Sequence, residues 1–118
     1  ETDAIIIGQI EHKSAVNNIQ KIVQNNDLDG IIIGPYDLSG SLGVAGDLSH
    51  KDVLESIDKV KEACLKNRMP LGDHIIEPKA SNVLERIKNG YSFIAFSVDF
   101  LFINYKLQDE FELLKKVK

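Results

Sequence analysis

The chain has 118 residues, which is enough for one domain with one modest hydrophobic core. Hydrophobic residues make up 43% and charged residues 27%, a composition that excludes an intrinsically disordered chain. The net charge of -4 argues against nucleic acid or an anionic membrane surface as a partner, and no apolar run reaches the roughly 18 residues of a membrane span.

Apolar runs and helical patterns alternate along the whole chain. Short runs of apolar, often β-branched residues indicate strands, and apolar residues repeated every three or four positions indicate helices. Ser49, with Asp52 three residues later, is expected to cap the second helix, and Gly90 to end the third. In chain order we expect a strand over 4–10, a helix over 14–25, a strand over 30–34, a loop over 38–49, a helix over 52–67, a strand over 69–76, a helix over 79–89, a strand over 91–98 and a helix over 106–117.

The order of these segments, βαβαβαβα, predicts an α/β fold with a parallel sheet. The runs 5–7 and 31–33 are apolar on both faces, as in strands that are covered on both sides. Two architectures remain open on this pattern alone: a small open sheet, or half of an eight-stranded barrel, whose complete form needs about 250 residues.

The single cysteine, Cys64, excludes a disulfide within the chain and a cysteine-based zinc cluster. It falls on the apolar face of the second expected helix, so we expect a small buried hydrophobe rather than a nucleophile. This cysteine usage, together with the absence of a signal-peptide pattern after Glu1, predicts a cytoplasmic protein.

Polar residues follow the first two expected strands, at the end where α/β proteins place their sites. Gln9 and Glu11 end the first strand, and Asp37 follows the second. Two neighbouring carboxylates repel each other, and a hard divalent cation such as Mg²⁺ or Mn²⁺ relieves that repulsion. Spacing alone leaves open a second interpretation, in which both residues are solvated loop acids or helix caps.

The sequence Gln-Ile-Glu at 9–11, followed one βα unit later by Gly-Pro-Tyr-Asp-Leu-Ser at 34–39, resembles the paired signature of the HpcH/HpaI aldolase family. The resemblance extends over essentially the whole chain. It implies that residues 1–118 are a single partial domain, a parallel (βα)₄ unit equivalent to the C-terminal half of a TIM (β/α)₈ barrel. It also implies a metal-dependent (class II) pyruvate aldolase, a carbon–carbon lyase that cleaves 4-hydroxy-2-oxo acids to pyruvate and a small aldehyde.

The resemblance also implies roles for individual residues. Glu11 and Asp37 would hold Mg²⁺ or Mn²⁺, with Co²⁺ as a further option, and the metal would act as a Lewis acid on pyruvate. Gln9 would contact the substrate, and the backbone amides of Tyr36 and Asp37 would hold the pyruvate carboxylate. The family's general base, a histidine, and its arginine belong to the N-terminal half of the barrel, upstream of this chain. No catalytic residue is therefore assigned here, and the chain alone is expected to be inactive.

Two positions depart from the family pattern. Tyr36 takes a place usually held by a small residue, although its backbone amide survives the change. His74 stands where the family tends to be apolar; we expect a hydrogen-bonded histidine at the rim, with an extra metal ligand or a contact to the second substrate as alternatives. Asp73 is expected to be structural, and Asp99 to cap the segment that follows it.

Two further functions remain open from the sequence. One is a non-catalytic half-barrel that serves assembly, and the other is a related carbon–carbon lyase that acts on a CoA thioester. The turn at 34–39 favours the aldolase over the thioester lyase. The apolar segment 100–105 indicates a surface for a partner, unless it covers the open barrel edge, and the resemblance implies a homo-oligomer in which a terminal helix packs on a neighbour.

Overall fold

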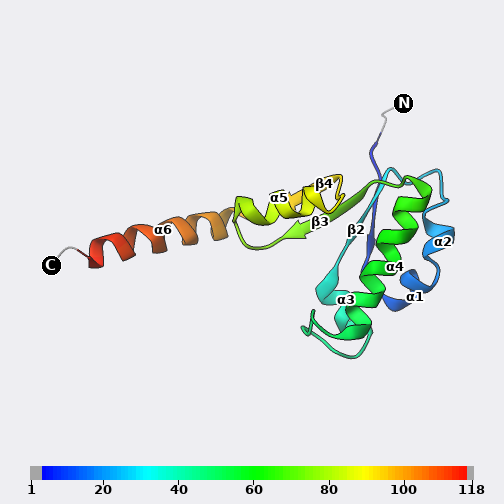
Figure 1. Ribbon diagram of the computed structural model, residues 1–118, viewed down its shortest axis with the longest axis horizontal. Coiled ribbons are helices and arrows are strands. Elements are labelled where there is room, and N and C mark those ends of the chain that lie inside the picture. The colour runs from blue at the N-terminus through cyan, green and yellow to red at the C-terminus, as the bar shows by residue number, and fades with distance from the viewer. Residues whose placement is uncertain (1–3, 117–118) are drawn as a thin grey trace.

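A parallel sheet of four strands forms the centre of the structure, a computed structural model that describes residues 4–116 (Figure 1). The strands follow one another across the sheet in chain order, and each neighbouring pair is parallel. The predicted α/β class and the four predicted strands are therefore confirmed, although the observed strands are shorter than expected. They are β1 (Ile7–Ile10), β2 (Gly30–Ile33), β3 (Leu71–Ile75) and β4 (Phe93–Phe96).

Helices connect the strands and follow the last one. The first predicted helix is divided in two at Asn18, whose side-chain amide donates to the carbonyl oxygen of Ser14 at 2.8 Å. Asparagine side chains compete for backbone hydrogen bonds and so favour helix ends over helix interiors. The described helices are α1 (Lys13–Asn17), α2 (Ile19–Ile22), α3 (Pro35–Ser41), α4 (Lys51–Asn67), α5 (Ala80–Lys88) and α6 (Asp99–Lys115).

Helix α3 occupies the beginning of the segment that was predicted to be a loop, so that prediction is wrong over 38–41. Its Gly- and Ser-rich composition concealed two helix signals. Pro35 is the first helical residue, where its fixed φ suits the helix and its missing N–H costs nothing. Leu38 is completely buried against the core and anchors the short helix. Burial of one leucine therefore overrides the weak helix propensity of its neighbours.

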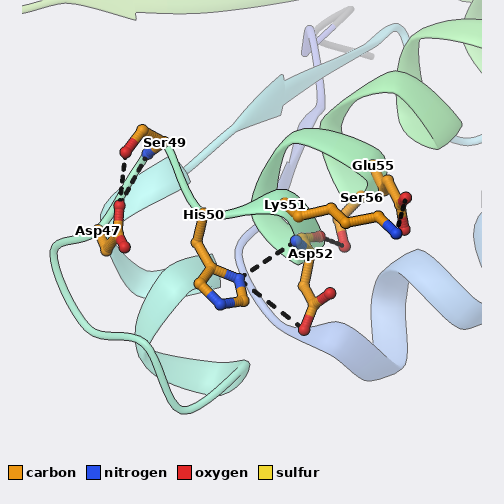
Figure 2. A network of polar contacts seen from close by, with 7 residues as sticks. All are labelled: Asp47, Ser49, His50, Lys51, Asp52, Glu55 and Ser56. Atoms are coloured by element: carbon orange, nitrogen blue, oxygen red, sulfur yellow. Dashed lines mark hydrogen bonds and ion pairs between the residues drawn. The ribbon is translucent and has the colours of Figure 1, made fainter.

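The N-terminus of α4 is capped by His50 and not by Ser49, which corrects the predicted cap (Figure 2). His50 Nδ1 accepts a hydrogen bond from the backbone N–H of Asp52 at 3.2 Å. The hydroxyl of Ser49 instead donates to Asp47 Oδ1 at 2.8 Å, and this bond lowers the pKa of the Asp47 carboxyl. The helix begins at Lys51, one residue before the predicted start at residue 52.

The hydrophobic core lies between one face of the sheet and helices α1, α2 and α4. Cys64 belongs to this core, and its burial raises the pKa of the thiol to about 11, so it stays protonated as a packing residue. The prediction of a small buried hydrophobe is therefore confirmed. The main buried hydrophobic residues are Ile10, Val16, Ile19, Ile31, Ile33, Leu38, Val60, Ala63, Cys64 and Leu71.

No helix within residues 4–116 covers the opposite face of the sheet, which is called the inner face below. Phe93 of β4 lies on this inner face, over Gly72 and Gly30. A Cβ at Gly72 would come within 2.1 Å of the Phe93 ring, and one at Gly30 within 3.1 Å. These two glycines leave the space that the phenylalanine ring fills, much as large and small residues alternate in barrel interiors.

Helix α6 extends away from the sheet and gives the molecule an elongated shape (Figure 1). It begins at Asp99, seven residues earlier than predicted, and none of its described residues is buried. The apolar spacing of Leu107, Phe111, Leu114 and Val117 predicts that these four residues face inward. The first three are half or more exposed, because no element of the described chain covers them. Val117, the fourth residue of that set, lies outside the described residues.

The overall dimensions agree with this open arrangement. The radius of gyration is 17.4 Å, whereas a compact chain of this length would have about 13.5 Å. None of the described helices has the length and the apolar composition needed to traverse a lipid bilayer.

Candidate metal and substrate site

Glu11 and Asp37 follow neighbouring strands at the same end of the sheet. Ile10 is paired with Ile33 in the parallel register, so β1 and β2 end together. The backbone N–H of Gly34 donates to the carbonyl oxygen of Ile10 at 2.9 Å, which keeps the two strands paired up to the residue before Glu11. The structure thus places both predicted metal ligands where parallel strands bring their sites.

Gly34 provides the space in which the side chains from β1 gather. A Cβ at this position would lie 2.7 Å from Gln9 Nε2 and 3.2 Å from Glu11 Cβ. Gln9 and Glu11 are two residues apart and so point to the same side of the strand. The φ of Gly34 is -101°, which any residue adopts, so this glycine serves to leave space and not to permit an unusual backbone.

A cavity of about 180 Å³ lies beside this glycine and is lined by the predicted substrate-binding residues. Gln9, Tyr36 and Asp37 line it, together with His74 and Ala95 from the next two strands. Glu11 is not among the described residues that line the cavity and lies next to it, against Gly34. The structure therefore brings Gln9, Tyr36 and Asp37 into one pocket, with Glu11 at its edge.

The first turn of α3 lines this cavity and contains two backbone N–H groups that make no hydrogen bond within the helix. The first helical hydrogen bond runs from the N–H of Leu38 to the carbonyl oxygen of Gly34 at 3.0 Å. The amides of Tyr36 and Asp37 precede it and have no acceptor inside the helix. Tyr36 lines the cavity, and its side chain is more than half exposed.

Ser39 holds α3 against the loop that follows it, a role that sequence reasoning missed. Its hydroxyl is completely buried, donates to the carbonyl oxygen of Tyr36 at 2.6 Å and accepts from the N–H of Gly46 at 2.9 Å. Leu38 and Ser39 thus anchor the buried side of the helix, while Asp37 is exposed. The signal available in the sequence was a small hydroxyl residue next to a glycine-rich loop.

Ser41 links the helix that carries Asp37 to the segment that carries Glu11. Its hydroxyl accepts from the backbone N–H of Lys13 at 3.0 Å and donates to the carbonyl oxygen of Leu38 at 2.8 Å. Lys13 opens α1, two residues after Glu11. No local pattern reveals this contact, because its partners are 28 residues apart in the chain.

Within residues 4–116, no group of three or more His, Cys, Asp and Glu side chains is arranged to hold a metal ion. His74 therefore does not form a three-residue ligand set with Glu11 and Asp37. Two carboxylates are nevertheless a common protein contribution to Mg²⁺ and Mn²⁺ sites, in which water and substrate oxygens complete the coordination. The donor chemistry of Glu11 and Asp37 fits such an ion.

The remaining polar residues at the strand ends have structural partners. Asp73 points to the helix-covered face and forms an ion pair with Arg86 of α5. Asp99 is the first residue of α6 and accepts a hydrogen bond from the N–H of Phe100 at 2.7 Å, although Val98 occupies the cap position itself. His12 caps α1 by accepting from the N–H of Ser14 at 3.2 Å.

His74 differs from these residues. Its backbone N–H donates to Asp73 Oδ1 at 2.9 Å, but neither ring nitrogen has a hydrogen-bond partner among the residues that the structure describes. The ring is exposed on the wall of the cavity. The expected hydrogen-bonded histidine at the rim is therefore not what the structure shows.

The chain is similar to aldolases both in sequence and in structure. It is 31% identical over 110 residues to a 5-keto-4-deoxy-D-glucarate aldolase of Klebsiella pneumoniae. The aligned region covers 91% of this chain and 42% of that protein. The crystal structure of an HpcH/HpaI aldolase from Desulfitobacterium hafniense matches with a TM-score of 0.81 and 27% identity, over 97% of this chain and 44% of that one.

A second solved structure supports the fold alone. It is an HpcH/HpaI aldolase/citrate lyase family protein from Burkholderia cenocepacia, with a TM-score of 0.86 and 23% identity over 96% of this chain and 43% of that chain. The prediction of a (βα)₄ unit equivalent to half of a TIM barrel is thereby confirmed, and the chain spans less than half the length of these relatives. The model of the HpcH/HpaI aldolase/citrate lyase family matches residues 1–104, and the chain belongs to that family.

Proposed function

We propose that this chain carries the metal and pyruvate site of a class II aldolase that cleaves 4-hydroxy-2-oxo acids to pyruvate and an aldehyde. The observation that carries the proposal is the gathering of Gln9 and Glu11 over Gly34, beside Asp37 and at the shared end of β1 and β2. The aldolase named among the relatives supports the same reaction class.

In this proposal Glu11 and Asp37 hold a divalent cation, Mg²⁺ or Mn²⁺ and by similar chemistry Co²⁺. When bound, the ion supplies Lewis-acid stabilisation of negative charge that develops on the keto oxygen of the substrate. Their position at the ends of two strands that remain hydrogen-bonded up to Gly34 makes the ligand spacing rigid.

The other residues of the site bind and orient the ketoacid. The Gln9 side-chain amide reaches the space above Gly34 and would contact the substrate. The backbone N–H groups of Tyr36 and Asp37 would receive the pyruvate carboxylate, since helix-start amides lack internal acceptors. No residue of this chain is assigned as the general base, which the proposal leaves to a part of the barrel beyond this (βα)₄ unit.

The test is metal binding by the two carboxylates, with turnover as a separate readout. We expect Glu11→Gln and Asp37→Asn each to weaken Mn²⁺ binding at least tenfold by electron paramagnetic resonance, since each removes one anionic ligand. Glu55→Gln is the matched control, because Glu55 is an exposed acid paired with Lys51 on α4. Unchanged Mn²⁺ affinity in both ligand variants would remove these residues as ligands.

The reaction is tested on the protein at its natural length. Pyruvate release from a 4-hydroxy-2-oxo acid should require Mg²⁺ or Mn²⁺ and stop when EDTA is added. If the protein releases no pyruvate under any metal condition, the aldolase proposal is wrong, even if the ion binds.

A non-catalytic role in assembly is the second candidate, and α6 is the observation that favours it. The helix projects from the sheet (Figure 1). Its large apolar side chains are exposed to solvent, a surface that is costly unless another molecule covers it. A homo-oligomer would bury this surface, and it is compatible with either function. A CoA-thioester lyase is a third candidate; the aldolases among the relatives and the turn at 34–39 favour the aldolase over it.

A further inference from the structure

His74 stands on the inner face of the sheet, two strands away from Glu11. Its register partner on β4 is Ala95, whereas the pairing of β2 with β3 ends at Ile32 and Gly72, two residues before His74.

Two residues that line the cavity together with His74 leave its ring accessible. Gly34 has no side chain and Ala95 has only a methyl group, so neither covers the imidazole. The cavity that His74 lines is the one lined by Gln9, Tyr36 and Asp37. A ketoacid bound at Glu11 and Asp37 would therefore have the imidazole on its far side, toward β3.

The residues around His74 limit the interactions that its imidazole ring can make. On β2, β3 and β4 the other residues of this face are glycines or apolar residues such as Ile32 and Phe93, so a histidine contributes little to packing that a leucine would not. It does not complete a metal ligand set among residues 4–116. A neutral imidazole offers one hydrogen-bond donor and one acceptor, which suits a hydroxyl or a carboxylate oxygen.

We propose that His74 is a specificity-determining residue that hydrogen-bonds an oxygen on the aldehyde-derived part of the substrate, selecting hydroxylated or carboxylated aldehydes over alkyl aldehydes. The inference rests on the proposed aldolase function, because it places the pyruvate part at Glu11 and Asp37. It assigns to His74 no part in metal binding or in holding pyruvate.

The test compares two 4-hydroxy-2-oxo acids of equal chain length, one ending in a carboxylate and the other in a methyl group, on the protein at its natural length. His74→Leu should lower kcat/KM for the carboxylate-ended substrate about tenfold, which corresponds to roughly 1.4 kcal/mol, and leave the methyl-ended one unchanged or improved. The dissociation constants of Mn²⁺ and of pyruvate, measured by calorimetry, should change by less than about twofold.

The matched control is His50→Asn, which removes an imidazole elsewhere but keeps a capping side chain on α4. It should leave the ratio of kcat/KM for the two substrates unchanged. His74→Gln retains a donor of similar reach and should recover part of the loss. A ratio that is the same in the wild-type protein and in His74→Leu overturns the proposal.

A spectroscopic readout separates binding from turnover. In protein labelled at histidine, the ring resonance that disappears in His74→Gln should shift when the carboxylate-ended substrate is added with Mg²⁺, and should stay in place with Mg²⁺ and pyruvate. A resonance that does not respond to that substrate also overturns the proposal. If the wild-type protein binds neither Mn²⁺ nor pyruvate, it is the proposed function that fails, and a failure of His74 alone leaves both affinities intact.

Discussion

Gly34 occupies the point at which the side chains of Gln9 and Glu11 lie over the end of β2. The absence of a side chain at Gly34 leaves room for these two side chains. A methyl group there would meet Gln9 Nε2 at 2.7 Å, inside normal contact distance, while the backbone would accept the change without strain. The site therefore depends on one glycine that no strand propensity or helix signal would single out.

Gly34→Ala should consequently impair the site more than the fold. Gln9 Nε2 is the far end of a flexible side chain and can swing away, so we expect the free energy of unfolding to fall by no more than about 1 kcal/mol. The affinity for Mn²⁺ with pyruvate should fall about tenfold, because Gln9 and Glu11 are displaced. Thermal unfolding and calorimetry give the two measurements.

Gly40→Ala is the control for that substitution. A Cβ at Gly40 meets no atom within 4 Å, and the residue lies within α3, so alanine there should leave affinity intact and stabilise the helix slightly. Equal affinities in the two alanine variants would show that the space above Gly34 is not used.

At the scale of elements, the position of α3 decides where Asp37 lies. The sequence predicted that Glu11 and Asp37 would meet at one rim, since parallel strands of a repeating βα pattern end together. It did not predict the helix itself, because Leu38 must be seen in the core before its anchoring role is evident. Nor did it predict the hydrogen bond between the Ser41 hydroxyl and the backbone N–H of Lys13, which belongs to another βα unit.

Ser41→Ala removes the hydroxyl that joins these two units. We expect the free energy of unfolding to fall by about 1 kcal/mol, the usual net value of one hydrogen bond, and Mn²⁺ affinity to fall severalfold as Glu11 and Asp37 lose their common support. Ser41→Thr keeps the hydroxyl and should restore the affinity. Electron paramagnetic resonance of Mn²⁺ together with chemical denaturation provides the measurements.

Ser56→Ala is matched to Ser41→Ala. The Ser56 hydroxyl also donates to a backbone carbonyl, that of Asp52 at 2.7 Å, but it stays within α4 and joins nothing else (Figure 2). Its removal should leave Mn²⁺ affinity unchanged. If both serine variants bind Mn²⁺ as the wild-type protein does, Ser41 has no role in positioning the carboxylates.

At the scale of the whole molecule, α6 is the feature that the sequence predicted least well. Its apolar spacing suggested a helix packed on its own sheet, whereas the structure sends it outward with Phe111 58% exposed. The periodicity of apolar residues indicates that one face of a helix is covered, but it does not identify the molecule that covers it. The expectation of a partner surface from segment 100–105 concerns the same helix and remains a proposal.

Phe111→Glu tests the proposed homo-oligomer. A carboxylate on the exposed apolar face should raise the dissociation constant of the assembly at least tenfold, since both the aromatic burial and the desolvation of the charge oppose association. Sedimentation equilibrium measures the change. Gln108→Glu adds the same charge at an exposed polar position of α6 and should have a much smaller effect. A wild-type protein that is monomeric at all concentrations would contradict the proposal.

The order of the strands has one more consequence. β1 and β4 each have a neighbour on one side only, so each leaves a row of backbone N–H and C=O groups directed sideways. A closed barrel has no such rows, because its first and last strands pair with each other. Within the described residues, the two rows therefore make β1 and β4 the edges at which the sheet is open to strand addition through backbone hydrogen bonds.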